Sequence, residues 1–236
     1  LAALGHGFGA WVRVKEPTVQ AQGQDARTCS RCGAKETRAV AKLPAPTTPA
    51  VKYGWSLTSG VWQYRHSDGS LAKGGWERIS GTWYLFDRNG GMLTGWQKVN
   101  GTWYYLKASG AMAEGWQQVG GTWYYLRPGS GAMAEGWASV GGAWYYLKPG
   151  SGAMAEGWQQ VGGTWYYLKA GGAMAEGWAS VGGAWYYLRP GSGAMVTGWL
   201  NLGGTWYWME SSGAMATGSR WVDGAWNRFS GSGAWL

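Results

Sequence analysis

The feature of this sequence that most limits its fold is a unit of 20 or 21 residues that recurs along most of the chain. Each unit opens with a Gly-Trp pair, carries a second Trp seven residues later and, in most copies, has a Met near its end. A fixed period of this length is typical of solenoids, because stacked units bury apolar surface that a single unit cannot bury alone. Eight units open at Trp55, Trp76, Trp96, Trp116, Trp137, Trp158, Trp178 and Trp199, and a degenerate ninth contains Trp221 and Trp226.

Each unit has the pattern of a β-hairpin. In residues 96–106, Asn100-Gly101 lies between two short strand-like runs, and Gly-Gly replaces this pair in most other units. Both pairs favour the two-residue type I′ turn of hairpins. The cross-strand pairs that this turn predicts are Val99–Thr102, Lys98–Trp103 and Trp96–Tyr105.

Strand alternation then decides which rings share a face of the hairpin. It places Trp96, Trp103 and Tyr105 on one face and Tyr104 on the other. A single short hairpin is not stable in water, whereas stacked copies cover one another's aromatic faces. The predicted fold is therefore an all-β solenoid of stacked β-hairpins, with Met and Leu filling the gaps, preceded by a short N-terminal leader module.

The composition excludes several other classes of protein. The chain has 44 Gly among 236 residues, 21 Trp, 14 Tyr and only 14% charged residues. Disordered chains are poor in aromatic residues, and seven Pro without a Gly-X-Y period cannot form collagen. No stretch approaches the roughly 18 apolar residues of a membrane-spanning helix, so we expect no membrane insertion.

The chain is predicted to have three parts: a small module over 1–42, a Pro/Thr linker over 43–52 and the repeat array over 53–236. The net charge of +8 lies mostly in the first parts, since residues 1–52 carry eight Lys and Arg against three Asp and Glu. The start of the sequence lacks the pattern of a signal peptide, so we expect a portion of a longer protein.

The rings of neighbouring hairpins suggest a binding site. Trp96 and Trp103 would form two walls of a concave box, Tyr124 of the next hairpin a third wall, and Met112 would lie close by in the intervening loop. Three aromatic faces around a small cavity suit a quaternary ammonium group, which has no N–H to satisfy and is attracted to π faces. The spacing alone leaves a second interpretation open, in which these rings are only the core of the solenoid.

The repeated pattern Gly-Trp-x4-Gly-x-Trp-Tyr-Tyr-Leu, followed after four or five residues by Gly-x-Met-x-x-Gly, resembles the choline-binding repeat of Gram-positive surface proteins and phage lysins. The resemblance covers residues 53–236. It implies a left-handed solenoid that is non-catalytic, has no cofactor and binds choline or phosphocholine on teichoic and lipoteichoic acids. It also implies a secreted protein at the cell surface, associated with the cell wall, for which oligomers remain possible.

The same resemblance assigns the choline sites to a Trp pair and the Tyr of the next repeat, with Met112, Met133, Met154 and Met174 nearby. The implied triads are Trp55, Trp62 and Tyr84; Trp76, Trp83 and Tyr104; Trp96, Trp103 and Tyr124; Trp116, Trp123 and Tyr145; Trp137, Trp144 and Tyr166; Trp158, Trp165 and Tyr186; and Trp178, Trp185 and Tyr207.

The last Trp pair departs from this pattern. Trp199 and Trp206 should be closed by residue 227, which is Asn. The site is therefore predicted to have two rings and to be weak or empty, and the ninth unit is predicted to be a polar cap.

The leader module contains the other chemical motif, Cys29-Ser-Arg-Cys32. A C-x-x-C pair is compatible with half a zinc site, a redox pair or a local disulfide. A zinc site needs four ligands and the leader offers only Cys29, Cys32 and His6, so we expect no metal. The surrounding residues resemble a Cys/His repeat of bacterial surface proteins, in which a Cys stands where this chain has Val19.

Three other functions are less well supported than choline binding. Glucan-binding repeats are similar and stack sugars on aromatic rings, but they use Tyr and Phe more than paired Trp. Binding of single-stranded nucleic acid is disfavoured, because residues 53–236 carry a net charge of only +3. The array offers no nucleophile and base set for an enzyme, and the two His of the chain, His6 and His66, lie in different modules.

Overall fold

The computed structural model describes residues 7–44 and 52–236, and the chain divides into two compact units, residues 1–52 and 53–236. All the regular elements in the described ranges are β-strands. The predicted all-β class is confirmed.

The first unit is a three-stranded antiparallel sheet with the order β1-β2-β3. Its strands are β1 (Val12–Lys15), β2 (Gly23–Thr28) and β3 (Lys35–Val40). Asp25 on β2 is buried and accepts bonds from Arg13 and Arg38 on the neighbouring strands. The hydrogen bond from Arg13, with help from Arg38, holds the pKa of Asp25 below its usual value, so the carboxylate stays ionised in the sheet.

The second unit consists of nine two-stranded hairpins, and residues 53–236 are described throughout. Their strands are β4 (Gly54–Thr58) and β5 (Val61–Arg65), β6 (Gly75–Ile79) and β7 (Thr82–Phe86), β8 (Gly95–Val99) and β9 (Thr102–Leu106), β10 (Gly115–Val119) and β11 (Thr122–Leu126), β12 (Gly136–Val140) and β13 (Ala143–Leu147), β14 (Gly157–Val161) and β15 (Thr164–Leu168), β16 (Gly177–Val181) and β17 (Ala184–Leu188), β18 (Gly198–Leu202) and β19 (Thr205–Met209), and β20 (Gly218–Val222) and β21 (Ala225–Phe229).

The hairpin turns have the predicted geometry and register. In the β8–β9 hairpin, Asn100 and Gly101 have φ values of 49° and 83°, which is the sign that a type I′ turn requires at both central residues. Gly-Gly turns reach the same region without the cost of a side chain, as Gly120 and Gly121 show. The observed partners Val99↔Thr102, Lys98↔Trp103 and Trp96↔Tyr105 confirm the predicted pairing.

Backbone hydrogen bonds connect each hairpin to the one before it. After β9 the chain folds back, and Met112 forms a β-bridge with Leu106 of its own hairpin. The Met112 N–H then donates to the carbonyl of Trp83 in the preceding hairpin at 2.8 Å. Corresponding bonds recur down the array, so each Met position is fixed by two consecutive hairpins.

The core of the array lies where these connections cross. From the second hairpin onward the last residue of each second strand is buried, and so is the small residue that follows each repeated Met from Met112 to Met215. These buried positions include Leu106, Leu126, Leu147, Leu168, Leu188 and Met209, with Ala113, Ala134, Ala155, Ala175, Val196 and Ala216. The predicted role of Leu in filling the gaps between hairpins is confirmed, whereas the repeated Met residues from Met92 to Met215 are only half-buried.

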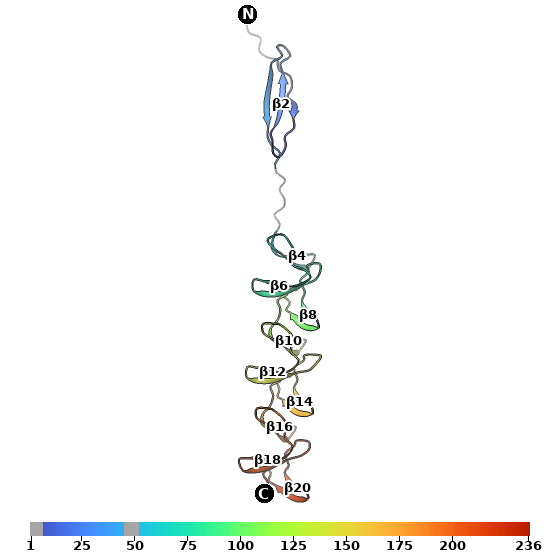
Figure 1. Ribbon diagram of the computed structural model, residues 1–236, viewed down its shortest axis with the longest axis vertical. Coiled ribbons are helices and arrows are strands. Elements are labelled where there is room, and N and C mark those ends of the chain that lie inside the picture. The colour runs from blue at the N-terminus through green and yellow to red at the C-terminus, as the bar shows by residue number, and fades with distance from the viewer. Residues whose placement is uncertain (1–6, 45–51) are drawn as a thin grey trace. The chain divides into compact units, whose positions relative to one another are not determined.

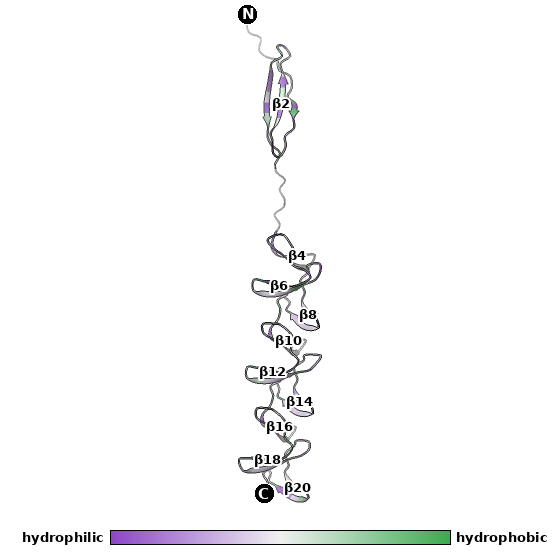
Figure 2. Ribbon diagram, in the orientation of Figure 1, coloured by the Kyte–Doolittle hydropathy of each residue, from purple (hydrophilic) through white to green (hydrophobic). Residues whose placement is uncertain are grey.

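Within the second unit, successive hairpins point in different directions around the stack (Figure 1). The hairpins that begin at β6, β12 and β18 project to the same side, as expected of a regular solenoid. Figure 2 shows the strands of the array in mostly pale colours, because Trp, Tyr and Gly have intermediate hydropathy. The Trp residues of the array are spread over all nine hairpins.

Candidate functional site

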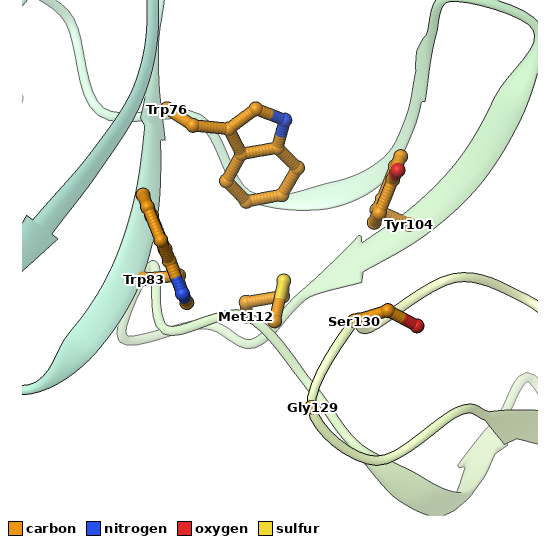
Figure 3. A pocket seen from close by; sticks show the side chains of 6 residues that line it. All are labelled: Trp76, Trp83, Tyr104, Met112, Gly129 and Ser130. Carbon is orange, nitrogen blue, oxygen red and sulfur yellow. The ribbon is translucent and has the colours of Figure 1, made fainter.

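A pocket of about 260 Å³ lies between consecutive hairpins (Figure 3). Trp76 and Trp83 come from one hairpin, Tyr104 from the next, and Met112 from the loop that follows Tyr104. In Figure 3 the two indoles and the phenol ring face a common space with the Met112 side chain between them. The turn at Gly129 and Ser130, which belongs to the third hairpin in the series, closes the remaining side.

The same arrangement recurs in four further pockets, with volumes from about 260 to 390 Å³. Each is lined by two Trp, the Tyr of the next hairpin, one Met and a turn residue of the hairpin after that. The lining rings and Met residues are Trp55, Trp62, Tyr84 and Met92; Trp96, Trp103, Tyr124 and Met133; Trp116, Trp123, Tyr145 and Met154; and Trp137, Trp144, Tyr166 and Met174.

The ring geometry is nearly constant through all seven predicted triads. The first Trp of each triad contacts the Tyr of the next hairpin with centroids 4.7–5.1 Å apart and planes at 61–68°. The last two triads share this geometry, and the Trp pairs Trp158 with Trp165 and Trp178 with Trp185 are 6.4 and 6.5 Å apart. The structure thus brings together the three rings of every triad that the sequence predicted.

The exposure of the second Trp of most triads shows that these rings are not part of the solenoid core. The second Trp of most triads is exposed, with 38–47% of its surface accessible in Trp83, Trp123, Trp144, Trp165 and Trp185. A core ring would be covered, because leaving a large aromatic side chain in water forfeits most of its hydrophobic contribution. The solenoid core is formed by Leu and small residues instead.

The Tyr residues of the triads also pack in the interface between hairpins. Tyr84, Tyr145, Tyr186 and Tyr207 are each half-buried and pack against the first Trp of their triad. The reason is their position in the interface between two hairpins, where each ring covers part of its neighbour. These four Tyr therefore contribute to the stacking of the array as well as to the wall of a pocket.

The seven triads differ from one another in exposure and in the pockets that they line. Trp62 is 46% exposed, and the pocket that it lines with Tyr84 is the largest of the five described, at about 390 Å³. Tyr145 lines a pocket of about 330 Å³. Tyr186 and Tyr207 contact the first Trp of their triads, Trp158 and Trp178. Contact with choline stays a prediction for all the rings of the seven triads, because ring geometry defines the walls of a pocket and not its occupant.

One predicted pairing is wrong. Met112 was expected beside Trp96 and Trp103, but it lines the preceding pocket with Trp76 and Trp83, and Met133 takes its expected place. The reason is the fold-back of the loop, which bonds the Met112 N–H to the Trp83 carbonyl.

Sequence reasoning also missed residues that line the pockets. Met92 lines the pocket of Trp55 and Trp62. Ser130, which lines the pocket of Trp76 and Trp83, belongs to a turn two hairpins after these Trp residues. The common Gly-x-Met spacing identifies Met92, whereas the contribution of the turn depends on the rotation from one hairpin to the next.

The last Trp pair also differs from its prediction. Asn227 occupies the Tyr position as expected, but the pair does not have two rings only. Trp235 packs against Trp199 with centroids 5.5 Å apart. The signal was present in the sequence, since Gly-Ala-Trp at 233–235 repeats the Gly-Ala-Met of 213–215.

Two charged side chains lie beside interior pockets. The Lys98 ammonium is 5.6 Å from the ring centroid of Trp103, a cation–π contact at the edge of the third pocket. The Glu156 carboxylate accepts a hydrogen bond of 2.8 Å from the Gly171 N–H, and Gly171 lines the pocket of Trp116 and Trp123. These two charges make chemically similar pockets electrostatically different.

The Cys motif of the first unit follows strand β2. Cys29 is buried and Cys32 is exposed, and a tight turn is closed by the bond from the Gly33 N–H to the Cys29 carbonyl. Among residues 7–44 and 52–236, no group of three or more His, Cys, Asp or Glu side chains could hold a metal ion. His6, the third candidate ligand, lies outside the described residues.

Comparison with known proteins identifies the family. A choline-binding repeat profile matches residues 74–114, 113–157 and 155–197, and a cell wall binding repeat profile matches residues 197–215. The chain belongs to the choline-binding repeat family. Its array is thus a cell-wall-binding module, and choline-binding repeats are non-catalytic. No match is found among curated proteins.

Solved structures of pneumococcal choline-binding proteins resemble the chain. CbpJ from Streptococcus pneumoniae TIGR4 is 41% identical with a TM-score of 0.68, over 75% of this chain and 62% of that one. Choline binding protein F from S. pneumoniae is 38% identical with a TM-score of 0.59, over 86% and 62%. The choline-binding domain of CbpL is 35% identical with a TM-score of 0.59, over 78% and 97%.

Choline binding protein F has also been crystallised with a peptidoglycan analogue and, by soaking, with ipratropium. The present chain matches 62% of the length of CbpJ and of choline binding protein F. In the described part of the chain, no helix is long and apolar enough to cross a membrane.

Proposed function

We propose that the array attaches its protein to a bacterial cell wall by holding the trimethylammonium group of choline on teichoic or lipoteichoic acid. The ligand would enter the seven triads formed by two Trp of one hairpin and the Tyr of the next. The observation that carries this proposal is the recurrence of three rings around an open pocket, with the second Trp exposed to solvent in most copies.

The pocket chemistry fits a quaternary ammonium ion. Such an ion has no N–H donor, so it gains nothing from hydrogen-bond acceptors and is stabilised by the negative faces of aromatic rings. Each ring contributes about 0.5–2 kcal/mol, and more when the cation is desolvated. The Met side chain adds a polarisable apolar contact to the methyl groups. Because the pocket is open, the phosphate end of phosphocholine can remain in water.

The relatives support the same chemistry. The names of choline binding protein F and of the choline-binding domain of CbpL state choline binding for those proteins. Ipratropium, soaked into crystals of choline binding protein F, is itself a quaternary ammonium compound. The proposed role is that of a secreted anchor at the cell surface, with no catalytic residues of its own in the array.

Retention of the full chain on a quaternary-amine matrix tests this function. We expect free choline to release the chain and NaCl to leave it bound, because desolvated cation–π contacts are screened much less than exposed ion pairs. Release by NaCl but not by choline would contradict the proposal and indicate ion exchange. Retention on dextran with release by soluble glucan, and no response to choline, would favour the carbohydrate alternative.

A further inference from the structure

The C-terminal end of the array contains a group of rings that none of the seven triads includes. Trp199 and Trp206 of the eighth hairpin have the same mutual arrangement as the interior pairs, with centroids 6.1 Å apart and planes at 86°. The Tyr that would close this pair is replaced by Asn227. Without a third ring, Trp199 and Trp206 would form only two walls of a pocket.

Trp235 occupies the Met position of this step. Its N–H donates to the carbonyl of Trp206 at 2.8 Å, as the Met215 N–H donates to Trp185 one step earlier at 2.7 Å. It also forms a β-bridge with Phe229, as Met215 does with Met209. The backbone of the last residues therefore continues the repeat, although the side chain at the Met position is an indole.

The indole of Trp235 packs against Trp199 much as the Tyr rings of the interior triads pack against the first Trp. It lies 5.5 Å from the Trp199 ring at an interplanar angle of 67°. The interior Tyr rings lie 4.7–5.1 Å from the first Trp at 61–68°. The third ring thus has nearly the same angle and a slightly larger distance.

Asn227 fixes the orientation of this indole. Its side-chain oxygen accepts a 3.0 Å hydrogen bond from the Trp235 Nε1–H. Its amide nitrogen donates to the carbonyls of Val222 and Ala225, at the turn of the last hairpin. The Asn that removes a ring from the Tyr position therefore positions the ring that comes from the Met position.

A carboxylate completes the terminal cluster. Asp223, in the turn of the last hairpin, accepts a 2.9 Å hydrogen bond from the Trp199 Nε1–H. The corresponding turn position holds Ser, Asn or Gly in the hairpins before it, such as Ser80, Asn100 and Gly120. The negative charge next to Trp199 raises the attraction of this cluster for a cation.

We propose that Trp199, Trp206 and Trp235 form an eighth cation site, here called the terminal site, which binds a quaternary ammonium group with added attraction from Asp223. This inference rests on the proposed choline function of the interior triads. It differs from them in having three indoles, a neighbouring carboxylate and no following hairpin. The array thereby ends in a binding site, where the sequence alone predicted a polar cap.

Choline titration of the full, ¹⁵N-labelled chain tests the terminal site by NMR. The reporters are the indole N–H signals of Trp206 and of Trp144, two rings with equal exposure of 43%. Each signal is assigned from the peak that is lost on replacing that Trp with Phe. We expect both signals to shift in a saturable way. If Trp144 responds and Trp206 does not, the terminal site is wrong while the proposed function stands; if neither responds, the proposed function itself is wrong.

Two variants separate binding from a merely structural role of the last residues. Trp235→Ala should weaken the response of Trp206 at least several-fold and leave that of Trp144 unchanged. Asp223→Asn keeps an acceptor for Trp199 and should weaken the Trp206 response two- to five-fold, since only the charge is removed. Trp226→Ala, which truncates an exposed ring of the last hairpin outside the site, is the control. A Trp206 response unchanged by both test variants would overturn the inference.

Discussion

At the scale of single residues, most pockets contain rings with different degrees of exposure. The first Trp, such as Trp137, is half-buried and contacts the Tyr of its own hairpin and the Tyr of the next. The second Trp, such as Trp144, is exposed and adds little to the core. A ring that packs in the stack and a ring exposed to solvent are thus adjacent in most pockets, so under the proposed function truncation of the second ring should affect binding more than folding.

Lys98 should reduce the affinity of one interior pocket, because its ammonium already lies over the ring of Trp103. We predict that Lys98→Gln, which introduces the residue found at the equivalent Gln118, raises choline affinity at the pocket of Trp96, Trp103 and Tyr124 two- to five-fold. That range corresponds to about 0.4–1 kcal/mol, as expected for an exposed charge contact. The effect should shrink at high salt.

The measurement is a choline titration followed at the Trp103 indole N–H. Lys15→Gln, which removes one positive charge from strand β1 of the first unit, is the matched control and should leave the pocket unchanged. A lower affinity in Lys98→Gln would mean that Lys98 supports the pocket instead of competing with the ligand.

At the scale of elements, the sequence was sufficient for the hairpins but not for their connections. Asn100-Gly101 and the alternation of rings predicted the turn and the register of each hairpin, because both depend on neighbouring residues only. The position of Met112 depends on a bond to the preceding hairpin, and that of Ser130 on the hairpin after next. These contacts are set by the stacking, for which the local pattern of one repeat gives no rule.

The same limit explains the error at the C-terminal end. Asn227 was interpreted from its own position, as a lost ring, whereas Trp235 restores the ring from a different position in the repeat. A comparison of every position of the last unit with its consensus would have shown both changes.

The turn that follows a hairpin packs against the Met of the pocket that the turn helps to line, as the turn at residues 129–131 does against Met112. A Cβ atom on Gly131 would overlap the sulfur of Met112, and Gly131 also has a positive φ of 68°. We predict that Gly131→Ala lowers thermal stability and, by displacing Met112, weakens choline binding at the pocket of Trp76, Trp83 and Tyr104 several-fold. Calorimetry and a titration followed at the Trp83 indole N–H measure the two effects.

Gly121→Ala provides the comparison for this prediction. Gly121 has a φ of 80°, but a Cβ atom there would meet nothing within 4 Å. The variant should therefore have only the backbone cost of about 1–2 kcal/mol, with no loss at the Trp76 pocket. Equal binding losses in both variants would show that the Met–Gly contact has no role in the site.

At the scale of the whole array, the proposed affinity for a wall polymer would arise from repetition of the pockets. Seven interior triads, and the terminal site, lie on one stack and would meet choline groups carried by one polymer or by neighbouring polymers. After the first contact, further contacts form at high effective concentration, so avidity exceeds the affinity of any one pocket. The small positive charge of residues 53–236 adds a weak attraction to a polyanion without dominating it.

The most direct test of the central claim is a crystal structure of the full chain grown or soaked in saturating choline. We predict electron density for a trimethylammonium group in each of the seven interior triads, enclosed by the two Trp and the Tyr and in contact with the Met that lines that pocket. Choline bound elsewhere on the hairpins, with the ring triads empty or closed, would contradict the account.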